Sequence, residues 1–332
     1  MLSQRLIRYA DLIPCRNAFV DSRTPGSDAK ENFTLIGPGV SENPNQHVHI
    51  PEAHGFNIGG ARQPPGCLNS QHSHETAEVF VVHTGRWRMI FGVNADEGEA
   101  VMEAGDVISI PTHMYRGFEN IGEETGFLFA VLGRDNPGKV TWAPRVFDLA
   151  KHYGLVLLEG GRLVDTTAGE TVPEGATLQR APDPDQIARL ATPPADRLAG
   201  CVVTPRQFIA NPASPLTAPG VEELAIITPA PTGDGFPPGP ISGWWEHGFN
   251  LRALRMASGA VVPMHARAEE EVIFVHRGVL QVKTPDGEVI LGPGDTFTTP
   301  KGLMRGFRAS SSAEVAAYVV RGGDAPAAPV FA

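Results

Sequence analysis

Apolar and polar positions alternate in short runs over much of the 332-residue chain, which predicts many short β-strands. Between residues 54 and 132, the runs HGFNIGGAR, EVFVV, RWRMIFGV and GFLFAVL are separated at close intervals by glycine- and proline-containing turns. Strict alternation is typical of half-buried strands, and continuous apolar runs are typical of fully buried ones. Six or more such strands with closely spaced turns indicate an antiparallel barrel or jelly roll.

A different pattern follows between residues 134 and 200. In PRVFDLAKHYGL, apolar residues recur at helical spacing from Val146 to Tyr153, and Gly154 is suited to end a helix. The stretch PDPDQIARLA predicts a second short helix, with Asp183 or Asp185 near its start. Because this segment is too apolar to be disordered, we expect a structured, partly helical connector.

The strand pattern then returns as a second copy of the first. GAVVPMHARAEEEVIFVHRG at 259–278 aligns position for position with GCLNSQHSHETAEVFVVHTG at 66–85. The stretches HGFN and GDVISIPTHMYRGF also recur, the latter as GDTFTTPKGLMRGF. Such an internal repeat indicates two copies of one domain. We therefore expect an N-terminal arm at 1–50, a first barrel at 51–133, a connector at 134–220 and a second barrel at 221–332.

The composition narrows the class of protein. The formal net charge is −10 and there is no basic run, which argues against a nucleic-acid partner. No apolar run is long enough to span a bilayer, and the N-terminal stretch lacks the apolar core of a signal peptide. Cys15, Cys67 and Cys201 are far apart and odd in number, which is typical of free thiols in a reducing compartment. We therefore expect a cytoplasmic protein.

Candidate metal ligands are concentrated in the stretch QHSHETAEVFVV. His72 and His74 are two residues apart, so they share one face if both lie on a strand. Glu78 opens the next strand. If that face is the barrel interior, two imidazoles and one carboxylate converge, and this set binds a divalent first-row metal while leaving coordination positions open. A second H-x-H pair, His47 and His49, has no carboxylate at the right spacing, so we interpret it as a surface or edge feature.

The same stretch resembles the first motif of the cupin family, G-x5-H-x-H-x3/4-E-x6-G. Gly66 and Gly85 complete the match around the two histidines and the glutamate. Gly105, Pro111 and Asn120 match the second motif, G-x5-P-x-G-x2-H-x3-N. The resemblance covers about half of the chain and implies an all-β fold of two jelly-roll barrels (double-stranded β-helices), with a metal inside the first. It implies no particular reaction, because this fold hosts oxygenases, decarboxylases, isomerases, lyases, storage proteins and sugar-binding regulators.

Two positions depart from the cupin motif. Arg116 stands where the family usually has its fourth ligand, a histidine, and His113 stands where it usually has a glycine. Arginine stays protonated and cannot donate a lone pair, so three ligands remain, with His113 as a possible fourth. We expect Arg116 either to hold a substrate carboxylate beside the metal or to join strands through a salt bridge, as Arg305 in the second copy would.

The second copy departs further from the motif. It keeps His265 and Glu271 but has Arg267 in place of the second histidine. One histidine and one carboxylate do not make a tight metal site. We expect the Arg267 guanidinium to occupy the old metal position and to neutralise Glu271, because a buried carboxylate needs a partner. The second barrel is then a structural or dimerising unit, or a binding cavity without metal.

Three ligands on an octahedral ion leave up to three positions for water, substrate and dioxygen. We expect one divalent metal ion per chain, with Fe(II) first. The predicted activity is a dioxygenase that cleaves a small aromatic or enolic or keto acid. Glu78 and Arg116 are the candidate catalytic residues, and Arg116 and His113 the candidate substrate-binding residues. The aromatic residues that could line the pocket are Phe80, Trp87, Phe91, Tyr115 and Phe118.

Two other functions fit the same residues. With Mn, Zn or Ni, the site would polarise a carbonyl or carboxylate and support a non-redox lyase, isomerase or decarboxylase. Without turnover, the barrel would be a small-molecule-binding protein. In each case the expected partner is a small organic acid, and we expect the chain to form a homo-oligomer.

Overall fold

The computed structural model describes residues 2–190, 192–228, 232–241, 245–310 and 312–332. The chain divides into two compact units, described here one at a time. The N-terminal unit comprises residues 13–51 and 57–202, and the C-terminal unit comprises residues 1–12, 52–56 and 203–332. Residues 1–12 of the expected N-terminal arm thus belong to the C-terminal unit, and most of the expected connector belongs to the N-terminal unit.

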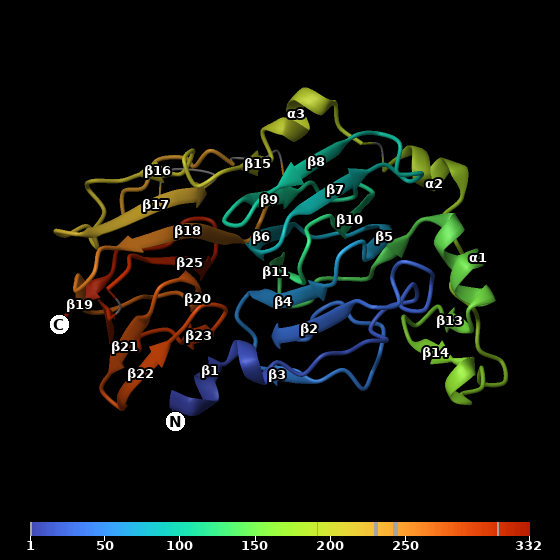
Figure 1. Cartoon of the computed structure of the whole chain (residues 1–332), viewed down its shortest axis with the longest axis horizontal. Coiled ribbons are helices and arrows are strands. Elements are labelled where there is room, and N and C mark those ends of the chain that lie inside the picture. Colours follow the sequence, from blue (N-terminus) through green and yellow to red (C-terminus); the bar gives the residue numbers. More distant parts are fainter. Residues whose placement is uncertain (1, 191, 229–231, 242–244, 311) are drawn as a thin grey trace. The chain divides into compact units, whose positions relative to one another are not determined.

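The N-terminal unit is a barrel made of a seven-stranded and a five-stranded sheet (Figure 1). In sheet order, the larger sheet contains β15 (Val202–Val203), β9 (Val107–Ile110), β6 (Glu78–Thr84), β11 (Gly126–Gly133), β4 (Phe56–Gln63), β2 (Glu31–Ile36) and β3 (Val48–Ile50). The smaller sheet contains β12 (Thr141–Trp142), β5 (Leu68–Ser73), β10 (Arg116–Asn120), β7 (Trp87–Phe91) and β8 (Glu99–Met102).

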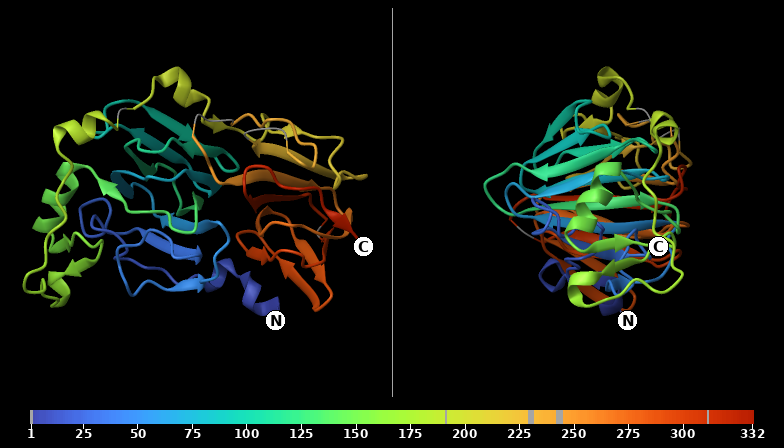
Figure 2. Two further views of the ribbon diagram at one scale, coloured as in Figure 1. Left: turned by 180° about the vertical axis from the view of Figure 1, so that it is seen from behind. Right: turned by 90° about the vertical axis from the view of Figure 1, so that its right-hand side faces the viewer.

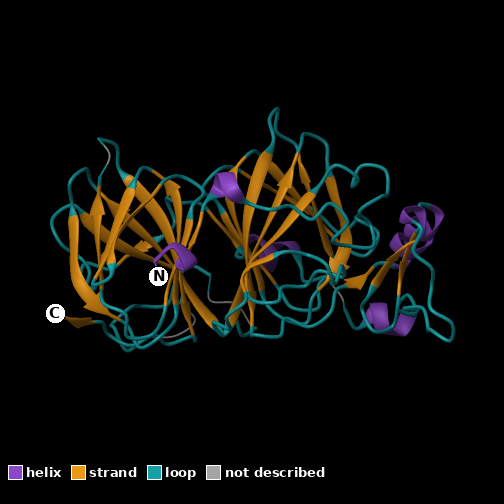
Figure 3. Cartoon of the chain, turned by 90° about the horizontal axis from the view of Figure 1, so that it is seen from below, coloured by secondary structure: helices purple, strands orange, loops and turns teal. Residues whose placement is uncertain are grey.

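The C-terminal unit repeats this arrangement with the same sheet sizes. Its larger sheet contains, in order, β1 (Leu6–Ile7), β23 (Thr296–Thr299), β20 (Glu271–Arg277), β25 (Val315–Gly322), β18 (Phe249–Met256), β17 (Val221–Ile227) and β16 (Ile209–Ala210). Its smaller sheet contains β22 (Gly287–Leu291), β21 (Leu280–Thr284), β24 (Arg305–Ala309), β19 (Val261–Ala266) and β26 (Val330–Phe331). The predicted all-β fold with two barrels is confirmed, and Figure 3 shows the strands of each barrel curving around an interior.

Helices are short and lie outside the strands of the barrels (Figure 3). Both predicted helices are present, and the second begins after an Asp183 capping box; Ala191, at the end of its predicted stretch, lies outside the described residues. Figure 2 shows, from behind, the partly helical segment 134–200 with its hairpin of β13 (Leu155–Leu157) and β14 (Leu163–Asp165). The elements outside the barrels are η1 (Leu2–Arg5), η2 (Tyr9–Asp11), α1 (Pro144–His152), β13 (Leu155–Leu157), β14 (Leu163–Asp165), η3 (Thr166–Ala168), α2 (Pro184–Ala188) and α3 (Ala195–Ala199).

Each barrel has its own apolar core. Phe80, Trp87 and Phe118 are part of the N-terminal core, and Ile273 and Phe297 are part of the C-terminal one. All three cysteines are buried free thiols. Among the described residues, the structure contains no helix with the length and hydropathy needed to span a bilayer.

Candidate metal centre

The two histidines and the glutamate of the first motif meet inside the N-terminal barrel. His72 lies on β5, His74 follows the end of that strand, and Glu78 opens β6 after a short turn. All three side chains are buried, and their ligand atoms lie within 4.8 Å of one another. Among the described residues, this is the one group of three or more histidine, cysteine or acidic side chains with that geometry. This geometry is suited to a divalent metal ion.

The ring of His72 is oriented by the backbone. Its Nδ1 lies 2.7 Å from the carbonyl oxygen of Ser70, which can only accept, so Nδ1 carries the proton and Nε2 keeps its lone pair. Trp142 packs against the ring, with centroids 5.1 Å apart. Burial, and then the positive charge of Arg116, hold the pKa of His72 well below its ordinary value. The imidazole is therefore neutral and ready to bind a metal.

His74 and Glu78 supply the other two ligand atoms. Nε2 of His74 lies 3.5 Å from Oε1 of Glu78, and its Nδ1 has no hydrogen-bond partner among the described residues. Burial lowers the pKa of His74, so it is neutral as well. Burial alone would raise the pKa of Glu78, but the guanidinium of Arg116, together with the contact from His74, outweighs it, and the pKa lies well below its usual range. Two neutral imidazoles and one carboxylate are a donor set that fits Fe(II), Mn(II) or Zn(II).

Arg116 binds the second oxygen of this carboxylate. It opens β10, directly opposite His72 in the register of β5 and β10. Its Nε donates to Oε2 of Glu78 at 3.1 Å, Nη2 donates to the same oxygen, and Nη1 donates to the backbone carbonyl of His72 at 3.0 Å. Of the two roles considered for Arg116, this is the salt bridge that joins strands. It leaves Oε1 of Glu78 for the metal.

His113 lies outside the cluster. Its side chain is exposed, and its backbone N–H donates to the carbonyl of His74 at 2.8 Å. The backbone of His113 has a φ of 64°, in the left-handed region where glycine is favoured, and glycine is the residue that the motif usually has there. The geometry therefore does not support His113 as a fourth ligand or as a residue that faces the metal.

A cavity of about 70 Å³ adjoins the three ligands. Of the five predicted lining aromatics, all of them buried, Phe80 and Phe118 line it, and the other three are not among its lining residues. The remaining wall comes from segments that the motifs do not mark. Its lining residues include Phe19, Asn32, Phe33, Val40, Gln46, Val140 and Trp142.

Two polar side chains in this wall have unused hydrogen-bonding atoms. Nδ2 of Asn32 and Oε1 of Gln46 are buried, and neither has a partner among the described residues. Gln46 is held by its own Nε2, which donates to the hydroxyl of Thr34 at 2.5 Å. Neither residue could be predicted from the sequence, because both lie in the loop-rich N-terminal arm far from the motifs. Among the described residues, the wall thus offers an unpaired amide nitrogen and an unpaired amide oxygen.

The equivalent position in the C-terminal barrel has no such group of three donors among the described residues. Glu271 is paired at both oxygens: Oε1 accepts from Nη2 of Arg305 at 2.7 Å, and Oε2 accepts from Nε of Arg321 at 2.8 Å. Arg267 donates instead to Asp234, at 2.9 Å. The expected pairing of Arg267 with Glu271 is therefore wrong. Arg267 pairs with Asp234 instead, because Arg305 and Arg321 already bind both oxygens of Glu271.

Comparison with known proteins follows the two repeats. Residues 46–155 match a family model described as "Cupin", and residues 253–321 match one described as "Cupin domain". Germin-like protein subfamily 1 member 7 of Arabidopsis thaliana is 34% identical over 88 residues, which are 25% of this chain and 38% of that protein. The match therefore spans well under half of that relative.

Three solved structures share the fold over nearly the whole chain. Oxalate decarboxylase from Bacillus subtilis matches with a TM-score of 0.57 at 10% identity, covering 98% of this chain and 78% of the other. AerE from Microcystis aeruginosa matches with a TM-score of 0.52 at 12% identity, covering 96% and 98%. The 7S globulin of Momordica charantia matches with a TM-score of 0.56 at 13% identity, covering 97% and 84%. At these identities the matches show a common fold.

Proposed function

Because this chain belongs to the cupin superfamily and carries two cupin domains, we propose a function for the metal centre of the N-terminal one. In this proposal the protein is a mononuclear Fe(II) dioxygenase that cleaves a carbon–carbon bond in a small enolic or keto acid. His72, His74 and Glu78 hold the ion. When bound there, Fe(II) supplies redox chemistry and open coordination positions.

The observation that carries this proposal is the lack of acid–base groups in the cavity. Apart from the three ligands, no described residue that lines it is an aspartate, glutamate, histidine, lysine, arginine, cysteine or tyrosine. A lyase or isomerase moves protons and depends on a side chain placed to carry them. Oxidative cleavage can rely on the metal and dioxygen for its chemistry, so this wall favours the dioxygenase over the non-redox functions.

The size of the cavity narrows the substrate class. An engineered cavity that accommodates benzene measures about 150 Å³, whereas this one measures about 70 Å³. The space therefore favours an acid of a few carbon atoms over an aromatic one.

The two free polar atoms of the wall suit an enolic or keto acid. Nδ2 of Asn32 would donate to a carbonyl or carboxylate oxygen, and Oε1 of Gln46 would accept from an enol hydroxyl. A substrate with both groups is oriented before the reaction. We assign Asn32 and Gln46 as substrate-binding residues.

Arg116 acts on the centre through Glu78 and is a positioning residue. Its guanidinium is occupied by that carboxylate and by the carbonyl of His72, and it is not among the described residues that line the cavity. The arginine keeps Glu78 ionised and fixes which oxygen faces the metal. This role replaces the direct substrate contact that we considered for Arg116 from the sequence.

A decarboxylase is the second candidate, because a cavity of about 70 Å³ also suits a two-carbon acid. It would use Mn, Zn or Ni without a change of oxidation state. It would also need a proton donor for the carbanion, and the described wall offers none besides the ligands.

Oxygen consumption distinguishes the candidates. Protein loaded with Fe(II) under anaerobic conditions is mixed with a panel of small 2-keto acids and 1,3-dicarbonyl compounds, and dioxygen uptake is recorded beside product analysis. We expect uptake that matches substrate loss one to one, and none in His74→Ala. Equal turnover without oxygen would move the assignment to the decarboxylase, and no turnover with any metal would leave a binding protein.

A further inference from the structure

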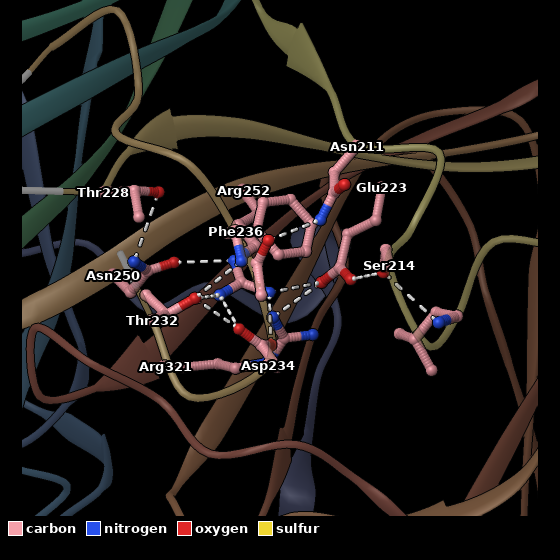
Figure 4. Close-up of polar contacts among 12 residues, drawn as sticks. Asn211, Ser214, Glu223, Thr228, Thr232, Asp234, Phe236, Asn250, Arg252 and Arg321 are labelled. Atoms are coloured by element: carbon pink, nitrogen blue, oxygen red, sulfur yellow. Dashed lines mark hydrogen bonds and ion pairs between the residues drawn. The ribbon is translucent and has the colours of Figure 1, made fainter. Parts of the chain in front are cut away.

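The interior of the C-terminal barrel contains an unbalanced set of buried charges. Four guanidinium groups and three carboxylates gather there, so one positive charge is in excess. The members are Arg252, Arg267, Arg305, Arg321, Glu223, Asp234 and Glu271, all buried. Figure 4 shows part of this set, with Arg252 and Asp234 side by side and Glu223 near Arg321. A buried charge without a partner is strongly destabilising, so the excess calls for a counter-charge.

Three of the arginines are well paired. Arg252 donates to both oxygens of Asp234, at 2.6 and 2.8 Å. Arg321 bridges Glu223 and Glu271 at 2.7 and 2.8 Å, and Arg305 donates twice to Glu271. These contacts occupy all three carboxylates.

Arg267 is the arginine left in excess. Its Nη1 donates to Oδ2 of Asp234, which also accepts from Arg252, and to the backbone carbonyl of Ala327. Its Nε and Nη2 are buried and have no hydrogen-bond partner among the described residues; Nη2 lies 3.9 Å from Glu223. Burial, and then the charge of Arg321, lower the pKa of Arg267 to about 10, so it stays protonated at neutral pH.

Another carboxylate, Glu269, lies two residues from Arg267 in the sequence, but the ion-pair partners of Arg267 among the described residues are Glu223 and Asp234. Glu269 is partly exposed, and its Oε1 accepts from the backbone N–H of Ala327 at 2.6 Å, while its Oε2 is buried without a hydrogen-bond partner among the described residues. Nε and Nη2 of Arg267 therefore have no hydrogen-bond acceptor among the described residues.

Two further side chains of the same interior have unused atoms. Nδ1 of His265 lies 2.9 Å from the carbonyl of Pro263 and so carries the proton, which leaves the buried Nε2 as an acceptor without a partner. Burial lowers the pKa of His265 to about 4, so the ring is neutral. Thr299 lies directly opposite Glu271 in the register of β20 and β23, and its buried hydroxyl has no partner either.

We propose that the C-terminal barrel binds a small oxyanion at Arg267, in the position that corresponds to the metal of the N-terminal barrel. The ligand class is a one- or two-carbon carboxylate that also carries an O–H group, and hydrogen carbonate is its smallest member. The anionic oxygens accept from Nε and Nη2 of Arg267 and from the hydroxyl of Thr299. The O–H group donates to Nε2 of His265. This ligand neutralises the excess charge and satisfies all four unused atoms.

The test titrates sodium hydrogen carbonate into protein treated with a chelator, at pH 8 and constant ionic strength, with calorimetry and thermal unfolding as readouts. The metal-free state removes binding at the N-terminal centre. We expect saturable binding and a rise of the unfolding temperature by about 3 °C or more at saturation. Formate lacks the O–H group, so we expect roughly tenfold weaker binding from the loss of one hydrogen bond.

Variants locate the site. Arg267→Met and Thr299→Val are expected to abolish and to weaken binding, respectively, and His74→Ala, in the other barrel, is expected to leave it unchanged. If Arg267→Met does not fold, Thr299→Val and His265→Phe carry the same comparison. Chloride that stabilises as well as hydrogen carbonate, binding that survives in Arg267→Met or Thr299→Val, or no saturable binding at all would each overturn the proposal.

Discussion

One carboxylate sets the chemistry of the N-terminal centre, because its two oxygens have different partners. Oε2 of Glu78 is bound by Arg116, and Oε1 faces His74. The arginine keeps the carboxylate ionised in a buried site, and the backbone contact of His72 fixes which ring nitrogen faces the metal. Such contacts around the ligands tune both the stability of the fold and the affinity for the ion.

Replacing Arg116 tests whether the two oxygens of Glu78 have these separate roles. Arg116→Met leaves Glu78 as an unpaired buried charge, and we expect a loss of about 3–5 kcal/mol in the free energy of unfolding and a roughly 10–100-fold loss of metal affinity. Arg305→Met is the matched control, since Arg305 pairs with Glu271 in the same way in the other barrel. Because Glu271 keeps Arg321 as a partner, this variant is expected to lose less stability and to leave metal affinity unchanged. Equal metal affinity in Arg116→Met and wild type would contradict the positioning role.

For the exposed His113 we expect a substitution to leave metal binding unchanged. Because its side chain lies outside the cluster, His113→Ala should keep its full metal content, whereas His74→Ala should lose it. Elemental analysis of both variants beside wild type makes the comparison. A marked loss of metal in His113→Ala would show that the side chain turns inward to become a ligand.

Glu42 makes the stability of the N-terminal unit sensitive to pH. Burial raises the pKa of its carboxyl to about 8, although the indole of Trp142 and the backbone N–H of Val20 donate to it. The charges that face it, Asp21 and Lys30, form a buried pair that nearly cancels. The folded state therefore binds this proton more tightly than the unfolded state, whose carboxyl has a pKa of 4.5. The stability that the bound proton contributes is lost as the pH rises from about 4.5 to 8.

We therefore expect the free energy of unfolding to fall across this range by up to about 1.4 kcal/mol per pH unit. Denaturant unfolding at pH 5, 6.5 and 8 measures the slope. Glu42→Gln, which has no proton to lose, should show a smaller slope. An unchanged slope in that variant would assign the pH dependence to other groups.

The two barrels have the same strand order but fill their interiors differently. Strand register and the repeat show which positions of the two barrels are equivalent. Asn32 corresponds to Glu223, Gly59 to Arg252 and Leu132 to Arg321. The three N-terminal residues line the metal cavity, whereas their C-terminal counterparts are buried charged side chains. The same fold thus holds an open site in one copy and a charged network in the other.

This difference predicts how the metal site can be rebuilt in the C-terminal barrel. Arg267→His restores the second histidine, but Glu271 keeps both oxygens bound by Arg305 and Arg321. We expect no second metal ion in this single variant and a second ion in Arg267→His/Arg321→Leu, which frees one oxygen as in the N-terminal barrel. Metal titration counts the sites. A second ion in the single variant would show that the arginine pair does not block the carboxylate.

At the scale of the whole molecule, the sequence predicted what local periodicity and the repeat determine. The main barrel strands and both helices followed from periodicity, and the gathering of His72, His74 and Glu78 followed from their spacing together with the resemblance to the cupin motif. Asn32 and Gln46 in the cavity wall did not, because the N-terminal arm reaches the site only through tertiary packing. Buried pairings were also beyond reach, since the three arginines around Glu271 compete for it and only geometry decides among them.

We propose that the N-terminal barrel alone holds one iron ion per chain through His72, His74 and Glu78. Elemental analysis of protein purified without added metal, beside His74→Ala, tests it most directly. We predict about one equivalent of iron per chain in the wild type and almost none in the variant. No metal in the wild type, even after reconstitution, or the same content in His74→Ala would contradict the claim.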